Sequence, residues 1–160
     1  MAKRSLSSIT VDYDLDSAIP YLVARTGSRM GGAFSKALKP YGLSLNEWRV
    51  CASLGRYPYQ RLSDLVVHAC VDMSALSRIV DRLIAQGLVS RERSDDDGRA
   101  VRLALTERGA DLVREIVPLA QLYENVAVKG FTKADMNMLR SLLNQLYDSA
   151  AQLEGGPGAS

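Results

Sequence analysis

Arginine is concentrated in one part of this chain. Seven of the fifteen arginines, and none of the five lysines, lie between residues 73 and 108. A guanidinium group is a planar fork that forms paired hydrogen bonds with phosphate oxygens and with the O6 and N7 atoms of guanine. Short hydroxyl groups accompany the arginines at Ser74 and Ser77, close to Arg78 and Arg82. This combination indicates recognition of phosphate groups and base edges.

A helix from about residue 73 to residue 86 has to hold these side chains. Its apolar residues recur every three or four positions and form one buried stripe, made of Leu76, Ile79, Val80, Leu83 and Ile84. The polar residues then fall on the other side, namely Ser74, Ser77, Arg78, Asp81 and Arg82. Gly87 supplies the left-handed residue that ends a helix. The sequence therefore predicts a recognition helix whose hydroxyls and arginines face outward.

Two short strands follow this helix. The first begins at Leu88, and the run from 94 to 98 has the composition of a turn. The returning strand has the period of two that a half-buried strand shows, with Val101, Leu103 and Leu105 alternating with Arg102 and Ala104. Thr106 can cap the next helix. This order of elements predicts a winged helix-turn-helix, with an ordinary helix and hairpin bearing a solvated charged face as the alternative.

At these positions the sequence resembles the MarR family of bacterial transcription regulators. The family's wing motif, Asp-x-Arg with alternating apolar residues and then Leu-Thr-x-x-Gly, is matched by Asp97, Arg99, Val101, Leu103, Leu105, Thr106 and Gly109. Its recognition helix and the stop after it are matched by Ser77, Arg78, Asp81, Arg82 and Leu83, and by Gly87, Leu88 and Val89. The resemblance continues upstream through 41–44 and 47–50. By the order of elements it covers roughly residues 15 to 153.

Helices account for most of the remaining chain. The first is expected from about Asp16 to Lys39, ended by Pro40 and Gly42. Ser44 and Glu47 form a capping box for a second helix to about Leu54, and a third covers about 62–69. A long helix is expected from Thr106 with a kink near Pro118, and a final one after a capping box of Thr132 and Asp135. The predicted fold is mainly α with a small β-hairpin wing.

The elements predict one domain at 16–153, with an amino-terminal arm at 1–15 and a disordered tail at 154–160. A winged helix-turn-helix lobe is expected at 41–105, between dimerisation helices at 16–40 and 106–153. The wide apolar stripes of these helices exceed what one small lobe can cover. The resemblance implies that they interlock with the same helices of a second subunit, giving a homodimer.

The resemblance also implies the partner, a double-stranded palindromic operator. Paired recognition helices would enter successive major grooves, and the wings would reach the flanking minor grooves. The expected DNA-binding residues are Ser74, Ser77, Arg78, Arg82, Arg91, Asp97 and Arg99. Arg99 is the expected minor-groove contact, and Asp97 is expected to orient Arg99 or Arg91. Repression is expected because it is the commoner mode in the family.

A small-molecule effector is a further expectation. Members of the family commonly bind anionic, often aromatic compounds, so the resemblance implies an aromatic carboxylate or its coenzyme A thioester. Arg25 and Arg29 lie four residues apart on the first helix, with Tyr21 one turn before, and paired guanidinium groups suit an anion. Trp48 is assigned to the core or to the floor of an aromatic pocket beside Arg49. The alternative for the arginines is exposed surface beside a close helix crossing.

Charge and motif content narrow the class of protein. The net charge is only +2, so DNA contacts have to come from local arrangement. We do not expect the protein to be an enzyme, because the chain has a single histidine and neither a nucleophile elbow nor a phosphate-binding glycine loop. We also expect no cofactor and no metal site. The sequence has no apolar run of membrane-spanning length and no signal-peptide core, which predicts a bacterial cytoplasmic protein, nucleoid-associated when bound to DNA.

Two other functions stay open. The two cysteines, Cys51 and Cys70, lie in apolar helical surroundings and are expected to be buried and inert, but a thiol-based redox-sensing regulator is an alternative. A winged-helix module that assembles proteins without binding DNA is another. The arginine-rich recognition face disfavours the assembly module.

Overall fold

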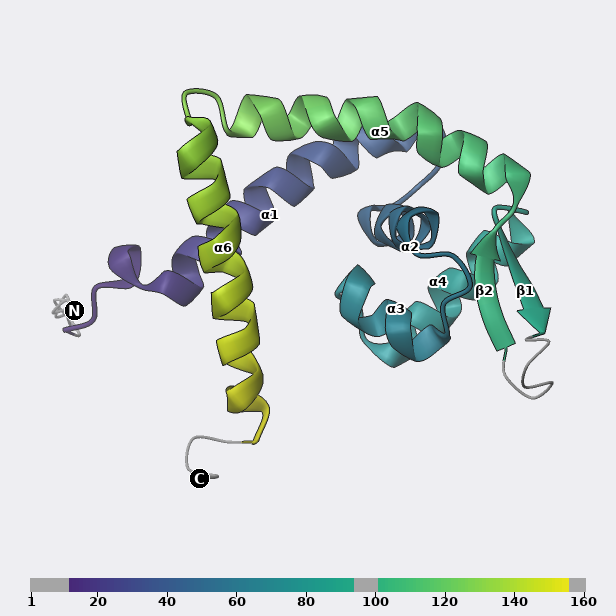
Figure 1. Ribbon diagram of the computed structural model, residues 1–160, viewed down its shortest axis with the longest axis horizontal. Coiled ribbons are helices and arrows are strands. Elements are labelled where there is room, and N and C mark those ends of the chain that lie inside the picture. The colour runs from purple at the N-terminus through teal and green to yellow at the C-terminus, as the bar shows by residue number, and fades with distance from the viewer. Residues whose placement is uncertain (1–11, 94–100, 156–160) are drawn as a thin grey trace, which may run out of the picture. The chain divides into compact units, whose positions relative to one another are not determined.

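The computed structural model describes residues 12–93 and 101–155 (Figure 1). It confirms a mainly helical chain with one antiparallel hairpin. The chain divides into two compact units, Met1–Arg114 and Glu115–Ser160. The predicted wing turn at 94–98, with Asp97, and the wing residue Arg99 lie outside the described residues, as do most of the predicted arm and of the predicted tail. The predicted domain at 16–153 and its internal boundaries stay a prediction.

Helix α1 (Ile19–Leu38) begins later than predicted. Residues Leu15–Ser17 form a separate 3-10 turn, η1, and the α-helix starts only at Ile19. Pro20 explains the difference, since proline fits the first turn of a helix, where its missing N–H has no partner to lose. The predicted end is confirmed: a 3-10 turn at Lys39–Tyr41, η2, leads into Gly42, whose φ of 68° is left-handed.

Three helices form the body of the first unit: α2 (Leu45–Arg56), α3 (Leu62–Ala69) and α4 (Met73–Ala85). The predicted capping box of α2 is present, because Ser44 Oγ accepts from the Glu47 N–H and the Glu47 carboxylate accepts from the Ser44 N–H. Of the predicted stripe of α4, Leu76, Val80 and Leu83 are at most 1% exposed, whereas Ile79 and Ile84 are half-buried. The same core includes Leu38, Val50, Leu54 and Leu65.

Strands β1 (Val89–Arg93) and β2 (Val101–Leu105) form the hairpin, with Val89 opposite Leu105. A third segment, which the sequence did not suggest, joins this sheet through a β-bridge between Gln60 and Leu103. In this bridge the Leu103 N–H donates to the Gln60 carbonyl at 2.8 Å. The buried side-chain amide of Gln60 donates to the carbonyls of Ser53 and Tyr57. The turn between α2 and α3 is thereby fastened to the hairpin.

Helix α5 (Glu107–Ala127) starts where the hairpin ends. As predicted, Thr106 caps it: Thr106 Oγ1 accepts from the Gly109 N–H at 3.0 Å and donates to the Gly87 carbonyl at 2.7 Å. The helix continues through Pro118, and the kink expected there stays a prediction. None of the helices within the described residues has the length and apolar character needed to cross a bilayer.

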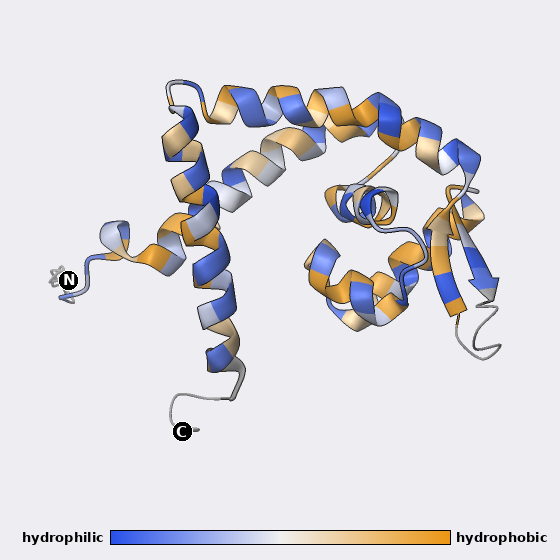
Figure 2. Ribbon diagram, viewed as in Figure 1, coloured by the Kyte–Doolittle hydropathy of each residue, from blue (hydrophilic) through white to orange (hydrophobic). Residues whose placement is uncertain are grey.

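Helix α6 (Lys133–Ala150) belongs to the second unit and ends in a 3-10 turn, η3 (Ala151–Gly155). Both hydrogen bonds of its predicted capping box, between Thr132 and Asp135, are present. No residue of α6 is buried in the single chain. Apolar residues nevertheless recur along it (Figure 2), and the exposed ones include Leu139, Leu142, Leu143, Leu146 and Tyr147.

Candidate nucleic-acid interface

The amino-terminal end of α4 carries the predicted hydroxyls. Asp72 caps the helix by accepting from the Ala75 N–H at 2.9 Å, and the Ser74 hydroxyl donates to the same carboxylate oxygen at 2.7 Å. These bonds, above all the one from Ser74, lower the pKa of Asp72. The Ser74 hydroxyl is therefore occupied as a donor and can only accept from a ligand. Asp72 was not singled out in the sequence, although aspartate before a helical apolar stripe is a cap signal.

Arg78 is exposed on the polar side of α4, and Ser77 is half-buried. Within the described residues Arg78 forms no ion pair, so its guanidinium is available to a ligand. The buried stripe of α4 includes Leu76, and at about 100° per residue Arg78 points about 160° away from it. Arg78 thus lies on the part of α4 that faces solvent most directly.

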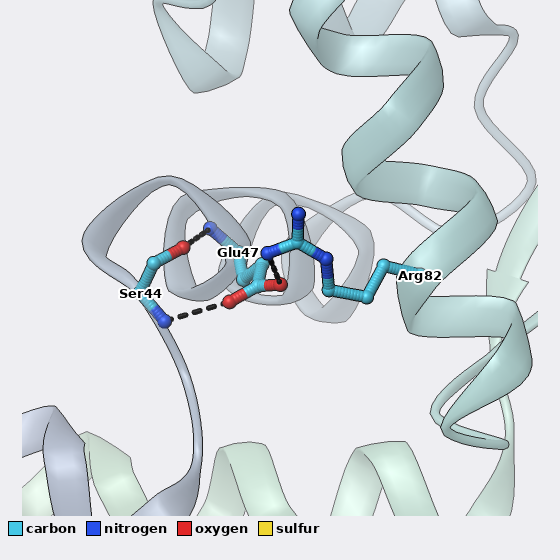
Figure 3. A network of polar contacts seen from close by, with 3 residues as sticks. All are labelled: Ser44, Glu47 and Arg82. Carbon is cyan, nitrogen blue, oxygen red and sulfur yellow. Dashed lines mark hydrogen bonds and ion pairs between the residues drawn. The ribbon is translucent and has the colours of Figure 1, made fainter.

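Arg82 differs from Arg78 because it has a partner on another helix. Its Nη1 lies 3.2 Å from Oε1 of Glu47, whose side chain is only 3% exposed (Figure 3). The other carboxylate oxygen of Glu47 accepts from the backbone N–H of Ser44 at 2.7 Å. The sequence indicated Glu47 only as part of a helix cap. Nothing local reveals its second role, because the two residues are 35 positions apart.

Arg91 of β1 pairs with Asp81 of α4, and both side chains are more than half exposed. This pair joins the hairpin to α4. The sequence offered Asp97 as one carboxylate to hold Arg91, but Asp97 and Arg99 lie outside the described residues. Among the described residues, Asp81 fills that role.

The predicted effector residues lie in two places. On α1, the Arg25 guanidinium carbon stands 5.2 Å from the centre of the Tyr21 ring and its Nη1 is 3.5 Å from Asp16, whereas Arg29 forms no ion pair within the described residues. On α2, Trp48 packs edge-on against Phe34 of α1, with ring centres 5.9 Å apart. Trp48 and its neighbour Arg49 are both half-buried.

The cysteines correct one expectation. Cys51 is buried as predicted, and desolvation followed by the charge of Glu47 raises the pKa of its thiol to about 12. Cys70 is exposed rather than buried, because it ends α3 in a left-handed conformation with a φ of 52°. Within residues 12–93 and 101–155, no three potential ligands among histidine, cysteine, aspartate and glutamate come close enough to hold a metal ion.

A helix pair followed by a hairpin, with the polar side of the second helix exposed, defines a winged helix-turn-helix protein. The model of the MarR family matches residues 43–101. The chain is 26% identical to the HTH-type transcriptional repressor IacR of Pseudomonas putida over 133 residues, which are 83% of this chain and 80% of that repressor.

Two solved structures agree. A MarR family regulator from Silicibacter pomeroyi superposes with a TM-score of 0.80 at 26% identity, covering 86% of this chain and 93% of that one. The Mycobacterium tuberculosis MarR family protein Rv2887, solved with p-aminosalicylic acid, gives 0.66 at 25% identity, covering 81% and 98%. The chain thus resembles the transcription regulators of the MarR family over more than four fifths of its length. It is a transcription regulator rather than an enzyme.

Proposed function

We propose that this protein is a homodimeric repressor that binds a palindromic operator and is released from it by a small aromatic acid. One observation is the main support for DNA binding. Arg78 stands exposed and without an ion pair among the described residues, on the solvent side of a helix that is held from behind by a packed core. An arginine presented in this way can form a bidentate contact with guanine in the major groove.

The DNA contacts we propose follow from this arrangement. Ser74, Ser77 and Arg78 contact the major groove, Arg91 contacts the backbone from the hairpin, and Arg99, oriented by Asp97, enters the minor groove. The exposed Asp81–Arg91 pair can open at little cost when a phosphate replaces the carboxylate, because both groups are already solvated. Arg82 has a different environment, since its own carboxylate partner is buried.

The proposed homodimer is supported by the second unit. Leu142 and Leu146 of α6 are 54% and 40% exposed, and Leu139 and Leu143 extend the same stripe. A single chain in water does not keep so long an apolar stripe uncovered without a reason. A second copy of the chain can cover it with the same residues, and the resulting two-fold symmetry matches a palindromic site.

The effector we propose is an aromatic carboxylate or its thioester, bound near Arg29, Arg25, Tyr21, Trp48 and Arg49. A relative solved with p-aminosalicylic acid supports this class of ligand. Relatives such as IacR are named transcriptional repressors, which supports repression as the mode of control. Release of the protein from DNA by the effector would then induce transcription.

Binding to genomic DNA fragments over a range of salt concentrations tests the proposal. Neutralised phosphates release counterions, so log K should fall linearly with log salt, by about 0.9 per phosphate contact. Specific, salt-dependent binding supports the regulator. Absence of specific binding would contradict it and would favour a protein-assembly module.

Replacing Arg78 with alanine should change the preference among operator variants. Loss of one bidentate base contact should cost about 1 to 3 kcal/mol against the preferred base and little against the others. Competition gel shifts with single-base operator variants measure this, with Arg114→Ala as the charge-matched control. Arg114 is 70% exposed and pairs with Asp111 on α5. A uniform loss over all variants would instead identify Arg78 as a phosphate contact.

Replacing both Arg25 and Arg29 with alanine should leave DNA affinity without ligand nearly unchanged. Release of DNA by the effector should weaken, within the usual coupling of about 1 to 3 kcal/mol. Gel-shift titrations with and without aromatic acids measure both quantities. The double replacement of Lys36 and Lys39 is the matched control, since it removes two exposed positive charges from the end of the same helix and from the 3-10 turn that follows it. Undiminished release by the arginine variant would refute the assignment of this site.

A further inference from the structure

We propose that Arg82 is a positioning residue, which with Glu47 fixes the recognition helix α4 against α2, and that it does not itself contact DNA. The inference rests on the proposed DNA-binding function and separates the arginines of α4 by role: Arg78 contacts DNA, whereas Arg82 holds α4 in the orientation that allows it. The observation behind it is the polar network of Ser44, Glu47 and Arg82 (Figure 3).

Glu47 makes the pair hard to break. Its side chain is 3% exposed, and each carboxylate oxygen has its own donor, the Ser44 N–H for one and Arg82 for the other. A buried carboxylate that loses its cationic partner is left without solvation or compensation. If Arg82 turned away to meet a phosphate, Glu47 would be left in that state. Arg82 therefore stays with Glu47 when DNA binds.

The Asp81–Arg91 pair provides the contrast. Asp81 is 59% exposed, so water can solvate its carboxylate when Arg91 leaves. The side chains of Arg82 and Arg91 are exposed to similar extents, 62% and 54%. The two ion pairs therefore differ in the exposure of the carboxylate and not in that of the arginine. Exposure of the arginine alone does not show whether it is free to bind DNA.

The position of Arg82 on the helix agrees with this role. It lies about two and a half turns after the start of α4 at Met73, whereas a recognition helix reads bases mainly with its amino-terminal residues. At about 100° per residue, Arg82 points about 120° from Leu76, on the flank of the helix, while Arg78 lies nearly opposite the buried stripe. Its bond to Glu47 shows that this flank faces α2.

The fixed angle between α2 and α4 has a consequence for binding. An operator is bound by the fraction of molecules in which α4 has the competent orientation, and the apparent dissociation constant rises as that fraction falls. Loss of the pair lowers this fraction without removing any contact from the bound complex. Affinity should therefore fall while the salt dependence stays the same.

The experiment measures operator binding by fluorescence anisotropy over a series of salt concentrations for Glu47→Gln, Arg82→Met and the double variant. Glutamine in place of Glu47 still accepts from Ser44, so the capping box is kept, and methionine in place of Arg82 keeps a long unbranched side chain. Each single variant should lose about ten-fold in affinity, as when the competent fraction falls to one tenth. The double variant should be no worse than either single one. The slope of log K against log salt should equal that of the wild type.

Two results would overturn the positioning role. A slope that falls by about 0.9 per subunit in Arg82→Met would identify a phosphate contact. An affinity unchanged in Glu47→Gln but lowered in Arg82→Met would show that Arg82 acts without Glu47. Arg114→Met is the matched control, because it breaks an exposed pair with Asp111 elsewhere and should leave affinity unchanged.

Thermal unfolding of the same variants without DNA tests the pair by itself. The losses of stability should be non-additive, and additive losses would refute the coupling of Glu47 with Arg82. A wild-type protein that binds no genomic fragment specifically would refute the proposed function instead, which is a distinct result.

Discussion

Replacing Gly109 with alanine should destabilise the protein by about 3 kcal/mol, a loss at the upper end for overpacking. A Cβ at this position would lie 2.0 Å from the carbonyl oxygen of Leu88 and 3.2 Å from a methyl group of Leu105. The obstacle is backbone, and it is held in place because the same carbonyl accepts from the Thr106 N–H at 3.1 Å. The first turn of α5 would have to move away from the segment that connects α4 to β1.

Thermal unfolding followed by circular dichroism measures the effect. For a chain of this length, about 3 kcal/mol corresponds to a fall in Tm of about 10 °C. Gly32→Ala is the control, because a Cβ there would meet nothing within 4 Å. That variant should gain about 1 kcal/mol from helix propensity. Equal stability of the Gly109 variant and the wild type would show that α5 does not need this close approach.

Local signals account for the features that the sequence predicted well. Ser44 with Glu47 and Thr132 with Asp135 begin helices because each pair satisfies free backbone groups within four residues. Gly87, with a φ of 69°, ends α4 for a reason equally local. The stripe of α4 was predictable because helical periodicity depends only on neighbouring residues.

Features that depend on distant residues were not predictable. Arg78 and Arg82 have the same type and face outward in a helical projection, yet only Arg82 meets a buried carboxylate from α2. The bridge from Gln60 to Leu103 joins segments that no periodicity connects. Cys70 shows a third limit, since its apolar neighbours suggested burial while its left-handed backbone turns it outward. Pairing and exposure are set by tertiary packing, which a single sequence does not reveal.

Replacing Leu142 and Leu146 with glutamate should convert the proposed dimer to a monomer and lower operator affinity by about 100-fold or more. Each carboxylate would have to lose its water to enter an apolar contact, at a cost that a buried charge without a partner does not recover. A monomer binds only one half-site of the operator. It therefore loses the gain in affinity, about 10² to 10⁴-fold, that comes from linking two binding modules. Analytical ultracentrifugation measures the mass, and anisotropy with the full palindrome measures the affinity.

The matched control places the same two charges at the same spacing on the other side of α6. Asn137 and Ser141 are exposed and, at about 100° per residue, point away from the stripe of Leu139, Leu142 and Leu146. Their double replacement by glutamate should leave both mass and affinity unchanged, which separates the loss of the interface from an effect of added negative charge near DNA. A dimer that survives the leucine replacements would contradict the role of α6. An affinity that falls equally in both variants would show that charge, not dimerisation, governs binding.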